Sequence, residues 1–161
     1  MSKIIYLAES EEFEIYNPIY VFNEDKEYDN CFCILKTCIG NIAFSYYNLG
    51  MNPNFIIQNN ILFLSFGISY YVINLGQGEI LYQSNNSISA IFEIVKCDAQ
   101  SCIVFIGELL LICFSFEGYL IWKNNYTDAI LDWVVYDKEI LLAFENGKKL
   151  SVSFDDGNGI F

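Results

Sequence analysis

The side chains with which this 161-residue chain could do chemistry are cysteines and carboxylates, because it contains no histidine and no arginine. Without histidine, Ser-His-Asp triads, Cys-His dyads and Cys₂His₂ zinc sites are excluded. Without arginine, the two-pronged binding of phosphate or carboxylate by a guanidinium group is excluded. The segment Gly76-Gln77-Gly78 is typical of a hairpin turn and lacks the rest of a phosphate-binding loop. We therefore expect no catalytic centre.

Six cysteines remain as candidate metal ligands or reactive thiols: Cys31, Cys33, Cys38, Cys97, Cys102 and Cys113. Alternate positions of a strand face the same side, so Cys31 and Cys33 would present both thiols on one face. Zinc clusters usually contain paired Cys-x₂-Cys sequences, which this chain lacks. Free cysteine is also among the most frequently buried residue types. We interpret all six as structural core thiols and expect neither a metal nor a cofactor.

Acidic residues outnumber basic ones by twenty to eight, which gives a net charge of −12. The first 29 residues hold eight of the acids and only two lysines, and so half of the net charge. A nucleic-acid-binding protein needs a basic surface to replace the counterions of the phosphates, so nucleic acid is excluded as a partner. An anionic membrane surface is disfavoured for the same reason. The charge favours a basic partner, although the acids could serve only to keep an aromatic-rich domain soluble.

Apolar and polar residues alternate from about Cys31 onward, and turn residues interrupt the pattern at short intervals. This is typical of antiparallel β-strands joined by tight turns. Gly107-Glu108 would close one hairpin in a type II′ turn, with glycine supplying the positive φ. Asn146-Gly147 is the strongest short-range hairpin signal in the chain.

A repeat of about forty residues, the length of one four-stranded propeller blade, emerges when the sequence is aligned with itself. Ile61–Gln83 falls on Ser101–Lys123, and a third, partial copy includes Leu141–Phe144. The matched positions are mainly glycines and apolar residues: Gly67 with Gly107, Gly78 with Gly118, Val72-Ile73 with Ile112-Cys113, and Tyr82 with Trp122.

From Phe55 to Gly159 the sequence resembles the blades of WD-repeat and quinoprotein-like β-propellers, in which a glycine turn separates apolar strands. The Trp-Asp dipeptide itself is absent, since Asp132-Trp133 runs in the opposite order. The resemblance implies an all-β, antiparallel, incomplete (half) β-propeller-like stack of blade sheets, because the visible copies are too few to close a ring. We predict a single domain over residues 1–161, with divergent N-terminal strands at 1–54 and propeller-like repeats at 55–159. The N-terminal strands would cover the sheet edge that the missing blades leave open.

Several charged and aromatic residues occupy informative positions of this repeat. Glu93 and Asp132 lie at equivalent positions of otherwise apolar strands, so they either face solvent or line a shared site. We interpret Trp122 and Trp133 as core anchors rather than interface residues. Asp155-Asp156 is typical of a turn after the last strand, although paired acids could also bind a cation or act in acid–base chemistry.

No segment of the sequence predicts secretion or a membrane span. The apolar run Ile4–Ala8 is too short for the core of a signal peptide. The longest apolar run, Cys102–Phe116, is shorter than a spanning helix needs and is interrupted by a turn signal. We therefore expect a soluble, cytoplasmic protein.

Small size, missing catalytic groups and strong acidity together predict a protein-binding role. The chain resembles immunity proteins of bacterial contact-dependent growth inhibition systems in its partial-propeller pattern and its Ile/Asn-rich, Arg-free composition. That resemblance implies an antitoxin that neutralises a cognate toxin, and a basic nuclease is the toxin that fits the charge. The alternative is a non-catalytic propeller-like scaffold or a carbohydrate- or peptide-binding module, and an enzyme acting through carboxylates alone is a third.

The acids expected to contact the partner come from the dense N-terminal segment and from the last turn. They are Glu11, Glu12, Glu14, Glu24, Asp25, Glu27, Asp29, Asp155 and Asp156. The last two are included because a C-terminal strand beside the N-terminal strands would bring the two groups together.

Overall fold

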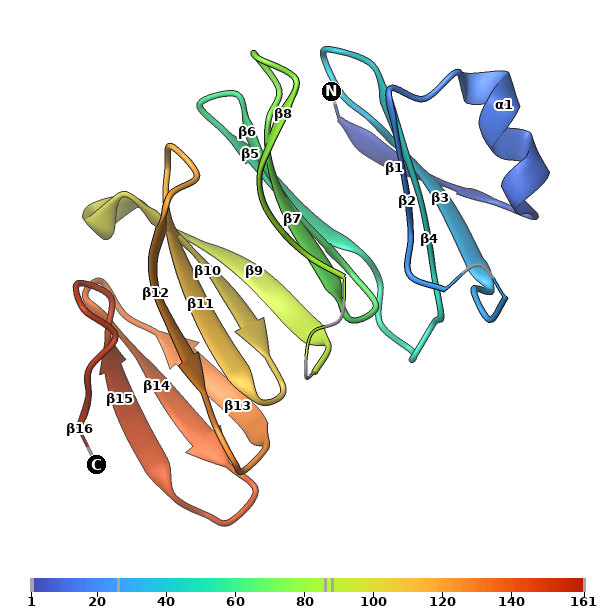
Figure 1. Ribbon diagram of the computed structural model, residues 1–161. Coiled ribbons are helices and arrows are strands. Elements are labelled where there is room, and N and C mark those ends of the chain that lie inside the picture. The colour runs from blue at the N-terminus through green and yellow to red at the C-terminus, as the bar shows by residue number, and fades with distance from the viewer. Residues whose placement is uncertain (1, 26, 86, 88, 161) are drawn as a thin grey trace. The chain divides into compact units, whose positions relative to one another are not determined.

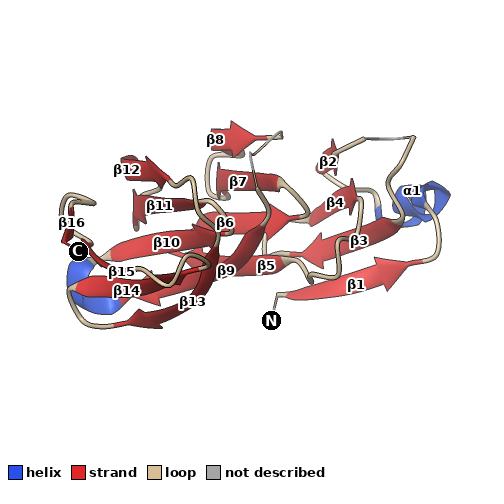
Figure 2. Ribbon diagram, turned by 90° about the horizontal axis from the view of Figure 1, so that it is seen from below, coloured by secondary structure: helices blue, strands red, loops and turns tan. Residues whose placement is uncertain are grey.

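The computed structural model describes residues 2–25, 27–85, 87 and 89–160. The described residues form sixteen strands in four four-stranded sheets, with very little helix (Figures 1 and 2). The predicted all-β, propeller-like fold is therefore confirmed. No helix of the described residues is long and apolar enough to cross a membrane. The chain divides into two compact units, residues 1–53 and residues 54–161.

The first unit contains one sheet with the strand order β1-β3-β4-β2. Its strands are β1 (Lys3–Leu7), β2 (Tyr20–Asn23), β3 (Cys31–Lys36) and β4 (Asn41–Tyr46). Strand β2 runs parallel to β4, with Tyr20 opposite Ile42, which departs from the antiparallel prediction. The two strands are not consecutive in the chain, because β3 lies between them in sequence, so no tight hairpin turn forces them to be antiparallel.

A short helical segment connects β1 to β2 in this unit, formed by η1 (Ser10–Glu12) and α1 (Phe13–Tyr16). It begins with a capping box, in which the Glu12 carboxylate accepts the backbone N–H groups of Ala8 and Glu9. It ends at Asn17, whose left-handed backbone suits a helix C-terminus. Its one buried side chain, Phe13, packs on the sheet in the cluster that contains Ile34 and Ala43.

The second unit consists of three successive sheets whose strands follow sequence order. The first sheet contains β5 (Asn54–Gln58), β6 (Ile61–Phe66), β7 (Ser69–Asn74) and β8 (Glu79–Ser84). The second contains β9 (Ile91–Cys97), β10 (Cys102–Gly107), β11 (Leu110–Ser115) and β12 (Leu120–Asn125), with the 3₁₀ turn η2 (Asp98–Gln100) after β9. The third contains β13 (Ile130–Val135), β14 (Glu139–Phe144), β15 (Lys149–Ser153) and β16 (Gly159–Ile160).

The predicted repeat equivalence is confirmed in the second unit. Val72-Ile73 lies in β7 and Ile112-Cys113 in β11, each the third strand of its sheet in chain order. Gly78 and Gly118, at φ +67° and +87°, form the turns before the fourth strands. The pairing of the third with the fourth strand contains a register shift in both sheets, at Val72/Ile73 and at Cys113/Phe114. The two shifts are separated by the length of one repeat to within one residue.

The type II′ turn predicted at Gly107-Glu108 is wrong, although β10 and β11 do form the hairpin. Gly67 has φ +50°, but Gly107 has no positive φ and ends strand β10. A Cβ atom on Gly107 would lie 2.8 Å from the Ala90 carbonyl oxygen, so close packing requires glycine here. At the other predicted turn Gly147 does adopt φ +80°, and its N–H donates to the Phe144 carbonyl.

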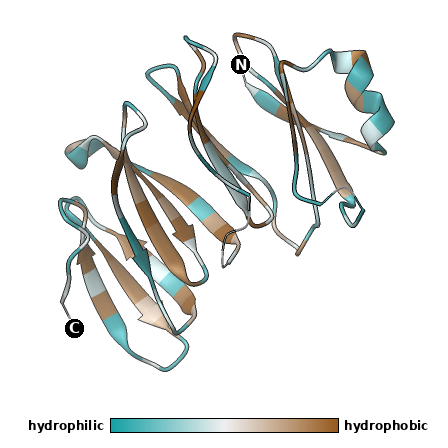
Figure 3. Cartoon of the chain, in the orientation of Figure 1, coloured by the Kyte–Doolittle hydropathy of each residue, from teal (hydrophilic) through white to brown (hydrophobic). Residues whose placement is uncertain are grey.

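The core of the second unit explains the continuous apolar run in β10 and β11. Ile103 and Phe105 point into the cluster shared with the first of the three sheets, which includes Phe63. Val104 and Ile106 point into the cluster shared with the last sheet. A strand covered on both faces is apolar at every position, as Figure 3 shows for β10 and β11.

Candidate partner-binding surface

Residues of two acidic stretches that are apart in sequence line one cavity of the first unit, and Asp29 is the acid among them. The first stretch, residues 9–14, includes the start of the helical segment, and the second, residues 24–29, follows β2. The cavity has a volume of 250 Å³. Its lining comes from the helical segment, the 24–29 loop and strands β2, β3 and β4: Ser10, Phe13, Val21, Asn23, Asp29, Phe32 and Ser45.

The cavity combines a carboxylate with buried polar and aromatic groups. The hydroxyl of Ser45, a residue only 2% exposed, lies 2.8 Å from Asn23 Oδ1 and 2.5 Å from Asp29 Oδ2. The second oxygen of Asp29 accepts the Asp25 backbone N–H at 3.1 Å. The rings of Phe13 and Phe32 meet edge to face with centroids 6.3 Å apart. The arrangement places negative charge beside an apolar wall.

The predicted N-terminal acids divide into exposed and half-buried groups. Glu11, Glu14, Asp25 and Glu27 are exposed, whereas Glu12, Glu24 and Asp29 are half-buried. Glu12 caps the helical segment, and Asp25 accepts the Glu27 backbone N–H at 3.1 Å. Part of this acidity therefore shapes the local backbone, and all of it remains at or near the surface.

The predicted C-terminal acids lie in the second unit, in the exposed turn after β15. Asn158 donates to Asp156 from both its backbone and its side chain, at 3.0 and 2.6 Å, and these bonds lower the pKa of Asp156. The Asp155 N–H donates to Ser153 Oγ. This is the turn chemistry expected for the pair. The last strand, β16, pairs with β15 and β1 pairs with β3, so the terminal strands do not share a sheet.

The two tryptophans have different environments. Trp122 is 8% exposed and its indole N–H donates to the Phe154 carbonyl, which confirms it as a core anchor. Trp133 is only partly buried, and its ring stacks on Phe92 with centroids 5.9 Å apart and planes 7° apart. Its indole N–H donates to Glu93 at 2.9 Å.

Exposed apolar residues lie near Trp133 along β13, and sequence analysis interpreted this tryptophan only as a core anchor. Leu131 and Val134 on β13 are 65% and 46% exposed. Glu93 and Asp132 are both exposed, which is the first of the two alternatives left open by the sequence, and Asp132 accepts the backbone N–H of Trp133. We call Phe92, Glu93, Leu131, Trp133 and Val134 the Trp133 ledge. The apolar residues at nearly every position of β13, a strand at the edge of its sheet, are the signal that could have revealed it.

Five of the six cysteines are buried or half-buried, whereas Cys38 is exposed in the β3–β4 turn. The prediction of a core position is therefore wrong for Cys38, because this residue lies in the exposed turn that connects two strands and not in a strand of the core. Burial raises the pKa of Cys33, and a hydrogen bond with Cys102, directly opposite on β10, raises the pKa of Cys97. In the described part of the chain, no three metal-ligating side chains are grouped to hold an ion.

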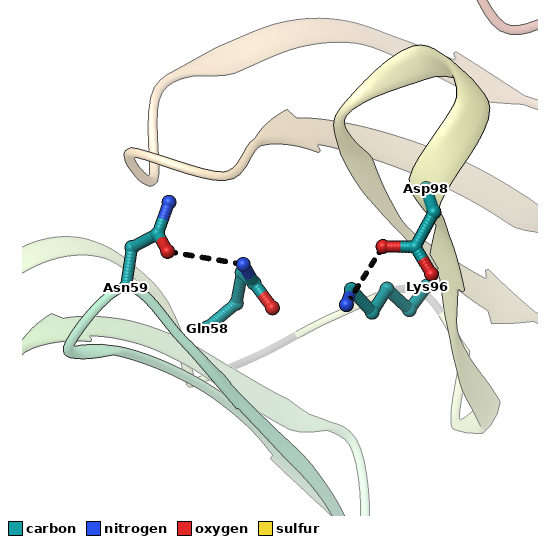
Figure 4. A network of polar contacts seen from close by, with 4 residues as sticks. All are labelled: Gln58, Asn59, Lys96 and Asp98. Carbon is teal, nitrogen blue, oxygen red and sulfur yellow. Dashed lines mark hydrogen bonds and ion pairs between the residues drawn. The ribbon is translucent and has the colours of Figure 1, made fainter.

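Ion pairing contributes little to the stability of the described part of the chain. Among the described residues, the ion pair found joins Lys96 and Asp98 at 2.7 Å, near the hydrogen bond between the Gln58 and Asn59 side chains (Figure 4). Both partners of this pair are well exposed, and such pairs contribute little to stability.

No known protein family and no curated protein matches the sequence. Solved propeller-like structures do match its fold. Sqt1 of Saccharomyces cerevisiae aligns with a TM-score of 0.50 at 12% identity, over 81% of this chain and 44% of that chain. A europium-containing methanol dehydrogenase aligns with a TM-score of 0.49 at 12% identity, over 66% and 23% of the two chains. Kluyveromyces lactis Hsv2 aligns with a TM-score of 0.40 at 14% identity, over 67% and 35%.

At these identities the similarity concerns the fold alone. The chain spans less than half the length of each of these structures. Fold by itself does not identify function, so the function has to be argued from the surface.

Proposed function

We propose that this chain is an immunity protein, which binds a cognate toxin in the cytoplasm and neutralises it by association, without catalysing a reaction. The observation that carries the proposal is the Asp29 carboxylate, which lines a cavity in the unit that holds eight of the twenty acids. The net charge of −12 extends the same preference over the whole chain. A partner with a basic surface is the one that this charge attracts.

A nuclease toxin has such a surface, because an enzyme that binds nucleic acid needs basic groups opposite the phosphates. Complementary charge accelerates the encounter, and fast association is what protection of the producing cell requires. Exposed acids of the first unit, such as Glu11, Glu14 and Glu27, would act mainly on the association rate. Nucleic acid and anionic membranes are not partners in this proposal, since both would be repelled.

The second candidate function is that of a propeller-like scaffold or a peptide- or carbohydrate-binding module. The Trp133 ledge favours it, because a partly exposed tryptophan with a hydrogen-bonded acid beside it is a common element of binding surfaces. Binding there would depend on aromatic contact and only weakly on salt.

The test is co-expression of this chain with the toxin-like product of an adjacent gene, followed by association kinetics of the purified pair. We expect growth to be restored, and the association rate constant to fall about tenfold or more between low salt and about 0.5 M salt. Glu11→Lys should slow association more than Glu117→Lys, which makes the same charge change at an exposed site of the second unit. An acidic partner, or association indifferent to salt, would contradict the proposal.

A further inference from the structure

We propose that the cavity of the first unit is the seat of a single lysine side chain presented by the basic partner. This rests on the proposed function and names the contact by which the acidic surface would recognise its target. Three features of the cavity support it: its acceptors, its apolar wall and its unpaired charge.

The polar end of the cavity has more hydrogen-bond acceptors than protons. The Ser45 hydroxyl has one proton, yet both Asn23 Oδ1 and Asp29 Oδ2 lie within hydrogen-bond distance of it. An ammonium group brings three donors and no acceptor, so it could bond to the lone pairs that remain on Asp29. Ser45 is almost fully buried, so this polar group lies inside the protein and not in a surface turn.

The same oxygens favour lysine over arginine. Each Asp29 oxygen already accepts one hydrogen bond, from Asp25 and from Ser45. A guanidinium group binds best to two free oxygens in one plane, whereas an ammonium group acts as a compact charge and needs no such edge.

The apolar end fits the stem of a lysine. Phe13, Phe32 and Val21 form a wall along which four methylene groups could lie, and lysine commonly buries its stem while its charged end stays polar. The volume of 250 Å³ exceeds the roughly 150 Å³ of a protein cavity that holds benzene, so there is room for this side chain.

The charge of Asp29 has no ion-pair partner among the described residues, whose ion pair lies in the second unit. A carboxylate that is half-buried and held in place by two hydrogen bonds is a stronger anchor for a cation than a mobile surface acid. The exposed acids Glu11 and Glu27 of the same unit raise the local concentration of cations, and Asp29 gives a cation a defined position.

The first experiment uses n-butylammonium, a lysine side chain without its backbone, in a backbone-amide NMR titration of the full chain. We expect saturable shifts at Ser45 and Phe32, and none with the neutral probe 1-butanol. Asp29→Asn keeps the shape and an acceptor oxygen but removes the charge, and should weaken binding about tenfold. Glu117→Gln removes the same charge from an exposed site of the second unit and should change affinity less than about twofold.

Two results would overturn the proposal: equal losses in Asp29→Asn and Glu117→Gln, or tighter binding of n-butylguanidinium than of n-butylammonium. If Asp29→Asn fails to fold by circular dichroism, Val21→Phe supplies the test, because it narrows the cavity from an exposed position without changing charge. It should abolish the shifts at Ser45, and their persistence would count against the cavity.

The second experiment measures the complex with the toxin, so that the two proposals can fail separately. Asp29→Asn should mainly raise the dissociation rate, whereas Glu14→Gln should mainly lower the association rate. If no toxin is bound but n-butylammonium is, the immunity function fails and the lysine site stands. If the toxin binds and both variants weaken it equally, the reverse holds.

Discussion

The surroundings of Trp122 and of Trp133 show how one residue type serves two purposes within a single unit. Trp122, on β12, closes the core between the last two sheets and also holds the C-terminal turn, through its bond to the Phe154 carbonyl. Trp133, on β13, lies partly open, stacked on Phe92 and bonded to Glu93. The two tryptophans differ in burial because their strands differ in position within the sheet and in how much of each face is packed against other residues. Composition alone does not reveal this difference in burial.

The C-terminal turn shows how closely the Trp122 side is packed. Gly157 has φ +72°, and a Cβ atom there would lie 2.7 Å from Trp122 Cδ2. Asn124 adds a bond from its side chain to the Gly157 carbonyl at 2.7 Å. The turn and the indole therefore form one packed element, whereas no comparable covering segment lies over the exposed Leu131 and Val134 of the Trp133 ledge.

The largest expected effect separates the two tryptophans directly. Trp122→Ala should lower the free energy of unfolding by about 3–5 kcal/mol, because it leaves a cavity between two sheets and an unpaired carbonyl at Phe154. Trp133→Ala should lower it by only about 1–2 kcal/mol, since stacking and one exposed hydrogen bond are lost. Urea unfolding followed by circular dichroism measures both. Equal losses would remove the distinction between core and ledge.

The next effect concerns the turn that covers Trp122. Gly157→Ala should lower the free energy of unfolding by about 2–3 kcal/mol, because it adds both a strained positive φ and a clash with the indole ring. Gly147→Ala is the matched control: φ is +80° and nothing lies within 4 Å of the added methyl, so only the backbone term of about 1 kcal/mol remains. Thermal unfolding of the pair isolates the contact with Trp122, and identical losses would mean that it contributes nothing.

Sequence-based prediction succeeded for the strands of the repeat and failed for one of its turns. The repeat placed Val72 and Ile112 in equivalent strands correctly, because β7 and β11 are buried at nearly every position and therefore form matching apolar runs. The turn at Gly107 was predicted wrongly. A glycine can be required either by a positive φ or by the close approach of another backbone atom, and a single sequence does not show which of the two applies.

The candidate site was predictable only in part. The acidity of residues 9–29 is plain in the sequence, but the cavity brings together Ser10, Asp29 and Ser45, which no repeat relates to one another. The parallel pairing of β2 with β4, which carries Asn23 to the side of Ser45, has no local signal because it joins non-consecutive strands.

A third expectation uses pH, since the core on the Trp122 side contains titratable thiols. The pKa of Cys97 is raised above its usual 9.0, chiefly by its hydrogen bond with Cys102 and by burial. Below that value both the folded and the unfolded thiol are protonated, so pH has no effect through this group. Above it the unfolded thiol ionises while the folded one does not, so the free energy of unfolding falls as pH rises.

Cys97→Ala should therefore flatten the loss of stability between about pH 8.5 and pH 10. Cys38→Ala, which removes an exposed thiol, should leave the slope unchanged. Urea unfolding across this pH range measures the slopes. Burial also raises the pKa of Cys33, Tyr46 and Tyr126, so some loss should persist in every variant. An unaltered slope in Cys97→Ala would contradict the role given to Cys97 and assign the alkaline loss to these other groups.

The smallest expected effect concerns the hydrogen bond between Trp133 and Glu93 in the Trp133 ledge. Trp133→Phe preserves the ring stacked on Phe92 but removes the N–H that donates to Glu93, so the free energy of unfolding should fall by only about 0.5–1 kcal/mol. Glu93→Gln keeps an acceptor oxygen for the indole and should change stability still less. The two variants therefore separate the ring from its hydrogen bond, and urea unfolding with replicate error below 0.3 kcal/mol is required to compare them. If Trp133→Phe were as damaging as Trp122→Ala, the indole N–H would be a structural requirement of β13, and the ledge would belong to the core. If Trp133→Phe is nearly neutral, Trp133 contributes little to stability beyond its stacked ring. The exposed edge of the indole is then available for contact with a binding partner.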